Sequence, residues 1–395
     1  FVVEVYAMLP YTGDYTEHFD PEKPSLTFYS FTPCPLMRGG VYQMDDELAA
    51  LLIEAHRNIG FLEGLVEYAP NKEAFAELML LKECTYSHMI DYDGPDFKEI
   101  LTIRGTGKGN ITPIMNLEAA YSAAANLEIH APDLSQICGI ALNGESENTP
   151  IDVRAHQTFW LGAKTNLKGY NPTAPDAVLP ALADISAYLY NDHNTDPLIK
   201  AALVHYQFEM IHPFERYNGI VGRILLPMIL RDVVEEARPL ICLSEYLYHN
   251  KNEYFDLLRT TQYSGGYIRW IKFFVNAIGQ AAKQSAEALI KYEKIINEDE
   301  MHLQAIPSWS PSVLSVYEYF KNVVVTNASS AEKNMKESFN TISKAFSILE
   351  KYGYLKQYDS RRRNRIFSYQ RLFATVFEDK STYMVITEDL EDVHR

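Results

Sequence analysis

The residues best suited to chemistry lie in one stretch, residues 203–226, where a histidine stands at the end of an apolar helical run. Apolar side chains recur through this run at helical spacing. Pro213 is expected to end the helix, because a proline disfavours helical geometry in the residue before it. His212 is therefore held at a helix end, where an imidazole can act as a general base.

A glycine-bearing turn and an arginine follow this histidine. Asn218 is expected to cap a second helix through its side chain, and the lack of side chains at Gly219 and Gly222 lets a ligand approach the backbone. The free amides of a first helical turn attract anions, and Arg223 adds a forked cation one turn further on. A base beside such an anion site suits the attack of a hydroxyl group on a phosphate ester.

A metal site is the alternative for the same helix. His205, Glu209 and His212 follow one another at i, i+4 and i+7, which places them on one helical face. Neither an HExxH pattern nor a cysteine ligand accompanies them, and the turn at Pro213 has no role in such a site. The sequence therefore favours the anion site and predicts no metal ligands here.

From His212 to Arg223 the chain reads HPFERYNGIVGR, which resembles the signature HPFx[DE]GNGRxxR of the Fic (Fido) domain family. Most characterised Fic enzymes that resemble it transfer AMP from ATP to a protein hydroxyl. The resemblance implies His212 as the general base and Arg223 as a contact to the distal phosphate of ATP or another nucleotide donor. It implies an anion hole at the amides around Asn218, Gly219 and Gly222. The implied partner is a protein with a Ser, Thr or Tyr hydroxyl.

Three positions depart from that signature. Arg216 replaces the acidic residue, Tyr217 replaces a glycine, and Ile220 replaces the first arginine. In the family the acidic residue holds Mg²⁺, which a guanidinium cannot bind, so the role of Mg²⁺ is in doubt and Arg216 becomes a fixed cation at the phosphates. Glu215 is the alternative metal ligand if the loop is shifted by one residue. The departures also keep open a second function, in which an inactive Fic fold acts as a binding or regulatory protein.

Residues 152–175 resemble the strand pair that the family calls the flap. The residues that match the flap here are Trp160, Leu161 and Gly162, and Arg154 also lies where the family has it. Alternating apolar and polar residues predict a strand whose exposed edge takes up a partner's segment by strand addition. An ordinary surface hairpin is the alternative.

Residues 82–92, KECTYSHMIDY, resemble the family segment that carries an inhibitory [ST]xxxEG motif. In that motif a glutamate pairs with the last arginine of the signature and blocks productive ATP binding. Ser87 stands at the place of the serine, Asp91 at that of the glutamate and Tyr92 at that of the glycine. Aspartate is one methylene shorter, so its contact with Arg223 is expected to be weak or mediated by water. The alternative is an amphipathic helix that only packs on the core.

Helical periodicity covers most of the first 300 residues, and the strand signals there are confined to the flap and to residues 2–6. Helices are predicted at 45–65, 73–90, 114–128, 176–190, 197–212, 218–236 and 266–297. The resulting fold class is mainly α, a Fic-type helical bundle with a short β-hairpin flap and a C-terminal winged helix. The predicted regions are 1–110 (N-terminal helices with the inhibitory motif), 111–296 (Fic-like core), 297–311 (linker), 312–376 (winged helix) and 377–395 (tail).

The C-terminal region is the basic part of an acidic chain. Residues 311–376 hold eleven basic and five acidic side chains, a charge of +6, which leaves −22 on the rest of a chain whose net charge is −16. Three helices and two strands there resemble a winged helix that binds duplex DNA. The predicted DNA contacts are Asn340 and Lys344 on a helix and Arg361, Arg362, Arg363 and Arg365 at the wing tip. A dimerisation or docking module with the arginines in a solvated turn is equally compatible.

Composition sets the remaining bounds. With 395 residues, 47% of them hydrophobic and 22% charged, the chain has the character of a soluble protein of two or three domains. No apolar run approaches the roughly 18 residues that a membrane helix needs. Four scattered cysteines without a CxxC pair favour a reducing compartment, so a cytoplasmic location is predicted. A homodimer is compatible with all of these observations.

Overall fold

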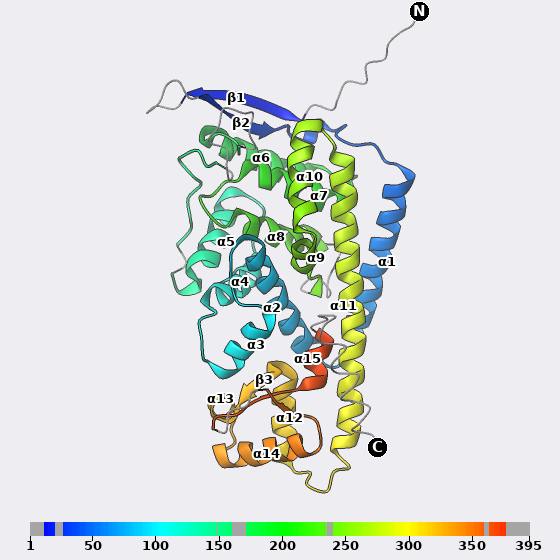
Figure 1. The fold of residues 1–395 in the computed structure, drawn as a ribbon. Helices are drawn as coiled ribbons and strands as arrows, with labels where there is room; N and C mark the ends of the chain where they lie inside the picture. The colour runs from blue at the N-terminus through cyan, green and yellow to red at the C-terminus, as the bar shows by residue number, and fades with distance from the viewer. Residues whose placement is uncertain are drawn as a thin grey trace, which may run out of the picture.

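The computed structural model describes residues 12–19, 27–147, 149–159, 171–232, 234, 240–358 and 363–376. Within these ranges the fold is mainly helical, as the sequence predicts, with two small antiparallel sheets (Figure 1). The helices are α1 (Asp46–Tyr68), α2 (Lys72–Asp91), α3 (Phe97–Thr106), α4 (Thr112–Ala124), α5 (Ala131–Asn143), α6 (Pro175–Asn191), α7 (Pro197–Ile211), α8 (Asn218–Ile229), α9 (Leu243–His249), α10 (Lys251–Ser264), α11 (Tyr267–Leu303), α12 (Pro311–Val323), α13 (Ala328–Asn334), α14 (Phe339–Lys351) and α15 (Gln370–Val376). The strands are β1 (Gly13–Phe19), β2 (Thr27–Pro33), β3 (Val325–Asn327), β4 (Lys356–Gln357) and β5 (Ile366–Ser368). None of these helices is long and apolar enough to cross a bilayer.

Helix α7 is enclosed by the rest of the fold. From Leu198 to Ile211 every side chain except that of Lys200 is buried, so α7 has no polar face. It packs against α6, α8, α11 and β2. Pro213 lies two residues after its end, and His212 closes the helix in a left-handed conformation with φ 51°. The helix that carries the candidate base is thus fixed from all sides.

Helix α11 joins the two ends of the molecule, and α1 lies along it (Figure 1). Its 37 residues span about 55 Å at 1.5 Å per residue. The predicted linker at 297–311 is therefore wrong in its first part, because α11 continues to Leu303. The reason is tertiary: Asp299 is buried and accepts hydrogen bonds from Tyr369 and Arg371, contacts that no local pattern reveals.

A hairpin of β1 and β2 covers one end of the bundle, and the sequence did not predict it (Figure 1). Its strands are antiparallel, with Gly13 opposite Pro33. β2 also meets the last part of residues 152–175, where the Phe31 amide donates to the Asn171 carbonyl at 3.1 Å. The prediction that strand signals before residue 300 are confined to the flap and residues 2–6 is therefore wrong.

The segment predicted as the first flap strand is not a strand in its described part, residues 152–159. The backbone of this segment instead forms a hydrogen bond with the loop after α7, in which the Arg154 amide donates to the Pro213 carbonyl at 2.9 Å. Trp160, Leu161 and Gly162 lie outside the described residues, as do residues 2–6.

Two helices end earlier than their apolar patterns predict. Helix α8 ends at Ile229 rather than at 236, soon after Pro227, which lacks the amide hydrogen that a helix uses. Helix α4 ends at Ala124 rather than at 128.

Residues 311–376, the C-terminal module, pack α12, α13 and α14 beside a sheet of strand order β3-β5-β4. The module is fixed to the end of α3. Thr326 Oγ1 donates to the Gly105 carbonyl at 2.6 Å, and Ser330 Oγ donates to the Thr106 carbonyl at 2.9 Å. These carbonyls lack partners within α3, so the two hydroxyls cap it. The approach is close because Gly105 has no side chain.

A side chain at Gly105 should therefore loosen the C-terminal module. An added Cβ would lie 1.5 Å from the Val325 carbonyl oxygen, so we expect Gly105→Ala to lower stability by roughly 1–3 kcal/mol or more. Gly60→Ala in α1 is the matched control, since nothing lies within 4 Å of its added Cβ, and it should stabilise the helix slightly. Thermal unfolding of the two variants measures the difference. Equal melting temperatures would contradict the docking described here.

Candidate active site

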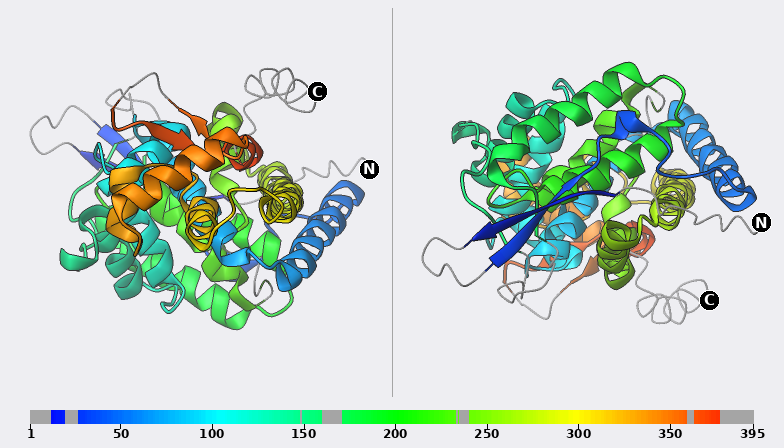
Figure 2. Two further views of the ribbon diagram at one scale, coloured as in Figure 1. Left: turned by 90° about the horizontal axis from the view of Figure 1, so that it is seen from below. Right: turned by 90° about the horizontal axis from the view of Figure 1, so that it is seen from above.

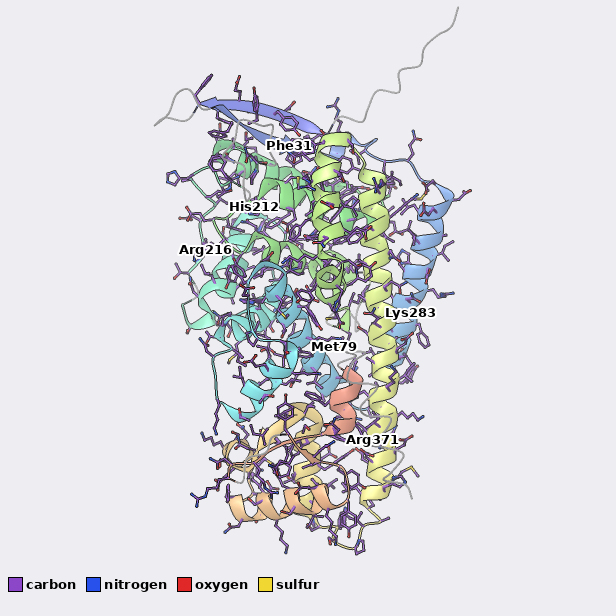
Figure 3. The ribbon with its side chains drawn as sticks, in the orientation of Figure 1. Phe31, Met79, His212, Arg216, Lys283 and Arg371 are labelled. Carbon is purple, nitrogen blue, oxygen red and sulfur yellow. The ribbon has the colours of Figure 1, made fainter. Side chains whose placement is uncertain are left out.

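The loop of residues 212–217 joins α7 to α8 and begins with the candidate base (Figure 3). His212 is half-buried, and its carbonyl accepts a hydrogen bond of 2.7 Å from Arg154 Nε. Burial lowers the pKa of His212 to about 4, and the charge of Arg154 acts in the same direction. A hydrogen bond to the Glu209 backbone and the charge of Asp91 oppose this change. At neutral pH the imidazole is therefore neutral, which is the protonation state that a general base requires.

Asn218 does not cap α8, and that prediction is wrong. The position before the helix belongs to Tyr217, which has a left-handed backbone (φ 66°) and makes no capping hydrogen bond through its side chain. The Asn218 amide instead closes the loop: its Oδ1 accepts from the Phe214 amide at 2.8 Å, and its Nδ2 donates to the Phe214 carbonyl at 2.7 Å. The first turn of α8 thus lacks a capping hydrogen bond from the side chain before it, and amides at such a helix start suit an anion.

Arg223 is buried and held by α2. Its Nε donates to Ser87 Oγ at 2.8 Å, and its Nη2 donates to the Ser87 carbonyl at 2.7 Å and to Asp91 Oδ2 at 2.6 Å. The expectation of a weak or water-mediated contact is therefore wrong. Gly219 provides the reason, since a Cβ there would lie 2.7 Å from Asp91 Oδ2. Burial acts to lower the pKa of Arg223, but the charge and the hydrogen bond of Asp91, with the charges of Tyr254 and Glu209, together raise it.

The three residues of the alternative metal site serve different purposes. Burial lowers the pKa of His205 to about 3, and its Nδ1 donates to the Gly222 carbonyl at 2.9 Å because a carbonyl can only accept. Its Nε2 then accepts from the Tyr254 hydroxyl at 2.8 Å. Both nitrogens of His205 are thus occupied. Among the described residues, no group of three or more histidine, cysteine or carboxylate side chains is arranged to hold a metal.

Glu209 is a buried acid whose importance the sequence did not reveal. Burial raises its pKa to about 8, so it carries a proton at neutral pH, and its Oε1 makes no hydrogen bond. It fits only because Gly222 lacks a side chain, whose Cβ would lie 2.5 Å from Oε1. The glycine that the sequence assigned to ligand approach therefore also makes room for a protein side chain.

Two of the positions that differ from the family signature, Arg216 and Tyr217, lie at the end of the loop of residues 212–217. Arg216 and Glu215 are exposed, and Figure 3 shows Arg216 on the same side of the molecule as His212. The rings of Tyr217 and Tyr92 contact each other, with centroids 5.4 Å apart. Both tyrosines stand where the resembling motifs have glycine, so the contact joins the end of α2 to the start of α8. Sequence reasoning treated the two positions separately and missed it.

The DNA candidates divide into two groups. Asn340 and Lys344 are exposed on α14, and Arg363 is exposed between β4 and β5. Arg365 is not at a free tip, since its guanidinium stacks on Phe367 with 4.8 Å to the ring centroid and its Nη1 pairs with Glu350 at 3.3 Å. Arg361 and Arg362 lie outside the described residues.

A cavity of about 230 Å³ lies on the flank of Arg223, between α2, α4 and α8. Its walls are mostly apolar, with Glu83 and Tyr121 among the polar groups. Glu83 is occupied by Tyr121 and Ser244, which donate hydrogen bonds to its oxygens. Arg223 is part of the lining of this cavity, whereas no residue of the His212 loop is.

Comparison with known proteins finds a family model that matches part of this chain. Residues 125–230 match the model of the Fic/DOC family. Protein adenylyltransferase fic-1 of Caenorhabditis briggsae is 42% identical over 64 residues, which cover 15% of this chain and 12% of that protein. A probable protein adenylyltransferase of Aquifex aeolicus (strain VF5) is 33% identical over 115 residues, 29% of this chain and 32% of that protein. The chain thus matches at most about a third of the length of these relatives.

A solved structure extends the likeness of the fold. The crystal structure of a Fic family protein from Desulfovibrio desulfuricans G20 superposes with a TM-score of 0.55, covering 84% of this chain and 98% of that one. The two sequences are 16% identical, so the match concerns the fold alone.

The raised pKa of Glu209 predicts a pH-dependent stability. Folding keeps a proton on Glu209 up to about pH 8, whereas the unfolded chain releases it near 4.5, so this contribution is complete below 4.5 and is lost as pH rises through 8. Glu209→Gln cannot ionise and should gain stability over the wild type as pH rises from about 5 to 8, by on the order of a few kcal/mol.

Denaturant unfolding across that pH range measures the gain. Glu67→Gln, an exposed position on α1, is the control and should keep a constant difference from the wild type. A constant difference for Glu209→Gln as well would mean that Glu209 ionises normally in the folded chain.

Proposed function

We propose that this chain transfers a nucleotide, AMP from ATP or a related phosphate ester, to a Ser, Thr or Tyr hydroxyl of a protein, because residues 125–230 match the model of the Fic/DOC family. The observation that supports this most is the pairing of a neutral His212 with the uncapped start of α8 and the buried Arg223. The names of the relatives, protein adenylyltransferases, point to the same reaction.

Each residue has a role in this proposal. His212 accepts the proton of the attacking hydroxyl, which makes the oxygen a better nucleophile. With ATP as the donor, this oxygen bonds to the α-phosphorus while the bond between the α- and β-phosphates breaks and pyrophosphate leaves. The amides of Gly219 and its neighbours bind the phosphate that is attacked, since they stabilise negative charge in the transition state. Arg223, once released from α2, binds the distal phosphates, and Arg216 supplies a second cation from the exposed side of the loop.

Mg²⁺ has a smaller part in this proposal than in the resembling family. The acidic position of the signature is Arg216, and the neighbouring Glu215 is exposed beside it. A guanidinium neutralises phosphate charge directly but holds no metal. We therefore expect nucleotide binding that depends little on Mg²⁺, which calorimetric titration of ATP with and without the ion measures.

The contact of Ser87 and Asp91 with Arg223 is proposed as an inhibitory clamp. Its hydrogen bonds of 2.6 to 2.8 Å hold the Arg223 guanidinium on α2. The guanidinium is then not available to bind the phosphates of the nucleotide. The Tyr92–Tyr217 ring contact adds to the hold of α2 on α8.

Release of this clamp is the direct test of the enzyme. Asp91→Ala should raise nucleotide affinity and transfer by roughly tenfold or more, because Arg223 loses its charged partner. Adding His212→Ala to that variant should cut transfer by roughly 10² to 10⁴ and leave nucleotide affinity nearly unchanged. Radiolabelled transfer to protein and calorimetry measure the two quantities, with Asp93→Ala as the control. Transfer that survives without His212 in a folded protein would overturn the mechanism.

A second function is proposed for the C-terminal module, a winged helix that binds duplex DNA. Two observations favour it: the order helix, strand, two helices and two strands, and the position of α14 across the end of the molecule, open to a partner (Figure 2). With an inactive Fic fold this module would make the chain a DNA-linked regulator. A cytoplasmic location and a homodimer stay predictions from the sequence.

DNA binding by the full chain should respond differently to two sets of changes. Replacing Arg361, Arg362 and Arg363 by Ala should weaken binding to all sequences and reduce the slope of log affinity against log salt by up to about 2.7, because wing arginines meet phosphates. Replacing Asn340 and Lys344 by Ala should alter sequence preference, because these side chains face base edges. Fluorescence anisotropy from about 50 mM salt upward measures both. No affinity at the lowest salt would reassign the module to protein docking.

A further inference from the structure

Arg154 is a buried arginine whose side-chain hydrogen bonds in the described structure go to backbone carbonyls. Its side chain is 2% exposed, and burial lowers its pKa to about 10. The acceptors lie on three segments that are distant in sequence: the end of α7, its own segment, and the start of the segment that leads into α6. Through these hydrogen bonds Arg154 connects three backbone segments, which an arginine exposed on the surface would not do.

Three consecutive carbonyls at the end of α7 bind this one residue. Arg154 Nη2 donates to Ile211 at 3.1 Å, Nε donates to His212 at 2.7 Å, and the backbone amide donates to Pro213 at 2.9 Å. The last carbonyls of a helix lack partners within it, and a cation there also complements the helix dipole. Together the three bonds fix the backbone on both sides of His212.

That backbone needs such support. His212 has φ 51°, a left-handed conformation that is unfavourable for a residue with a Cβ. Strained backbones at functional sites persist where the surroundings over-determine them. The direction of the imidazole depends on this conformation, because Cβ moves with φ and ψ.

The remaining bonds connect the same guanidinium to the two described segments on either side of residues 160–170. Arg154 donates to the carbonyls of His156 and Thr173. These segments also meet each other, since Gln157 Nε2 donates to the Pro172 carbonyl at 3.0 Å. The Thr173 amide donates back to α7, to the Met210 carbonyl at 3.2 Å.

We propose that Arg154 is the positioning residue of His212, holding its left-handed backbone and tying it to both segments that flank residues 160–170. The proposal rests on the function proposed above, in which His212 is the base. An arginine is required because its planar guanidinium donates hydrogen bonds to several carbonyls at fixed angles. A lysine has a single ammonium group and cannot reach them all.

Two variants of the full chain separate the effect of the guanidinium's geometry, the fork, from the effect of its charge. Arg154→Lys keeps the charge and loses the fork, and Arg154→Met loses both. In Arg154→Met the titration of His212, followed by NMR with labelled histidine and assigned with His212→Gln, should move upward by about one pH unit, since a nearby cation is removed. In Arg154→Lys it should stay near the wild type, with Asp91 and the Glu209 carbonyl still facing the ring as before. Both variants should lower kcat by roughly 10- to 100-fold and leave nucleotide affinity unchanged within about twofold, because Arg154 makes no contact with the amides of α8.

Arg231→Met is the matched control. Arg231 also binds carbonyls, those of Leu127 and Met228, so its loss should lower stability without moving the His212 titration or kcat. Wild-type values of both quantities in Arg154→Met would overturn the proposal. If Arg154→Met fails to fold, Arg154→Lys decides: an unchanged kcat overturns the proposal. If the wild type transfers nothing, the proposed function fails alone. The ring resonances of His212 at neutral pH in Arg154→Lys, which keeps the charge and loses the fork, then decide: they should move, and unmoved resonances would overturn the positioning role.

Discussion

The arrangement of side chains between α2 and α8 depends on a buried guanidinium that cannot lose its charge. Arg223 is 1% exposed, and an unpaired charge at such a place would cost several kcal/mol, so acceptors must be brought to it. Ser87 and Asp91 provide them from α2, which fixes the distance between α2 and α8. Gly219 stays without a side chain and so admits Asp91, whereas Glu209 keeps its proton because its burial outweighs the nearby charge of Arg223, which acts to lower its pKa. A ligand that binds the Arg223 guanidinium must replace its hydrogen bonds to Ser87 and Asp91.

The sequence predicted those parts of the fold and site that depend on local patterns. The mainly helical class, the helix end at His212 and the loop to α8 follow from apolar spacing and Pro213. It failed where distant segments decide the outcome. Asn218 has the chemistry of a cap, but a partner four residues back, Phe214, takes both ends of its amide. The β1–β2 hairpin and the last turns of α11 depend on contacts more than 60 positions away, which periodicity does not encode.

The loop between α7 and α8 holds two strained residues in close succession. His212 and Tyr217 are both left-handed, at a cost of roughly 1–2 kcal/mol each for residues other than glycine. The loop is stabilised from outside by Arg154 and from within by Asn218. A tyrosine at position 217 is tolerated because its ring packs on Tyr92, so the side chain that causes the strain also provides a contact that offsets it.

The capping of α3 by the C-terminal module has a consequence for how the chain is made. The hydroxyl of Thr326 reaches the carbonyl of Gly105 across 221 positions in the sequence. Because a ribosome releases the chain from its N-terminus, α3 emerges long before the strand that completes it. The end of α3 must therefore stay open until residues 326–330 have been synthesised. During that interval the carbonyls of Gly105 and Thr106 are left to water, and the surface that the module later covers is exposed.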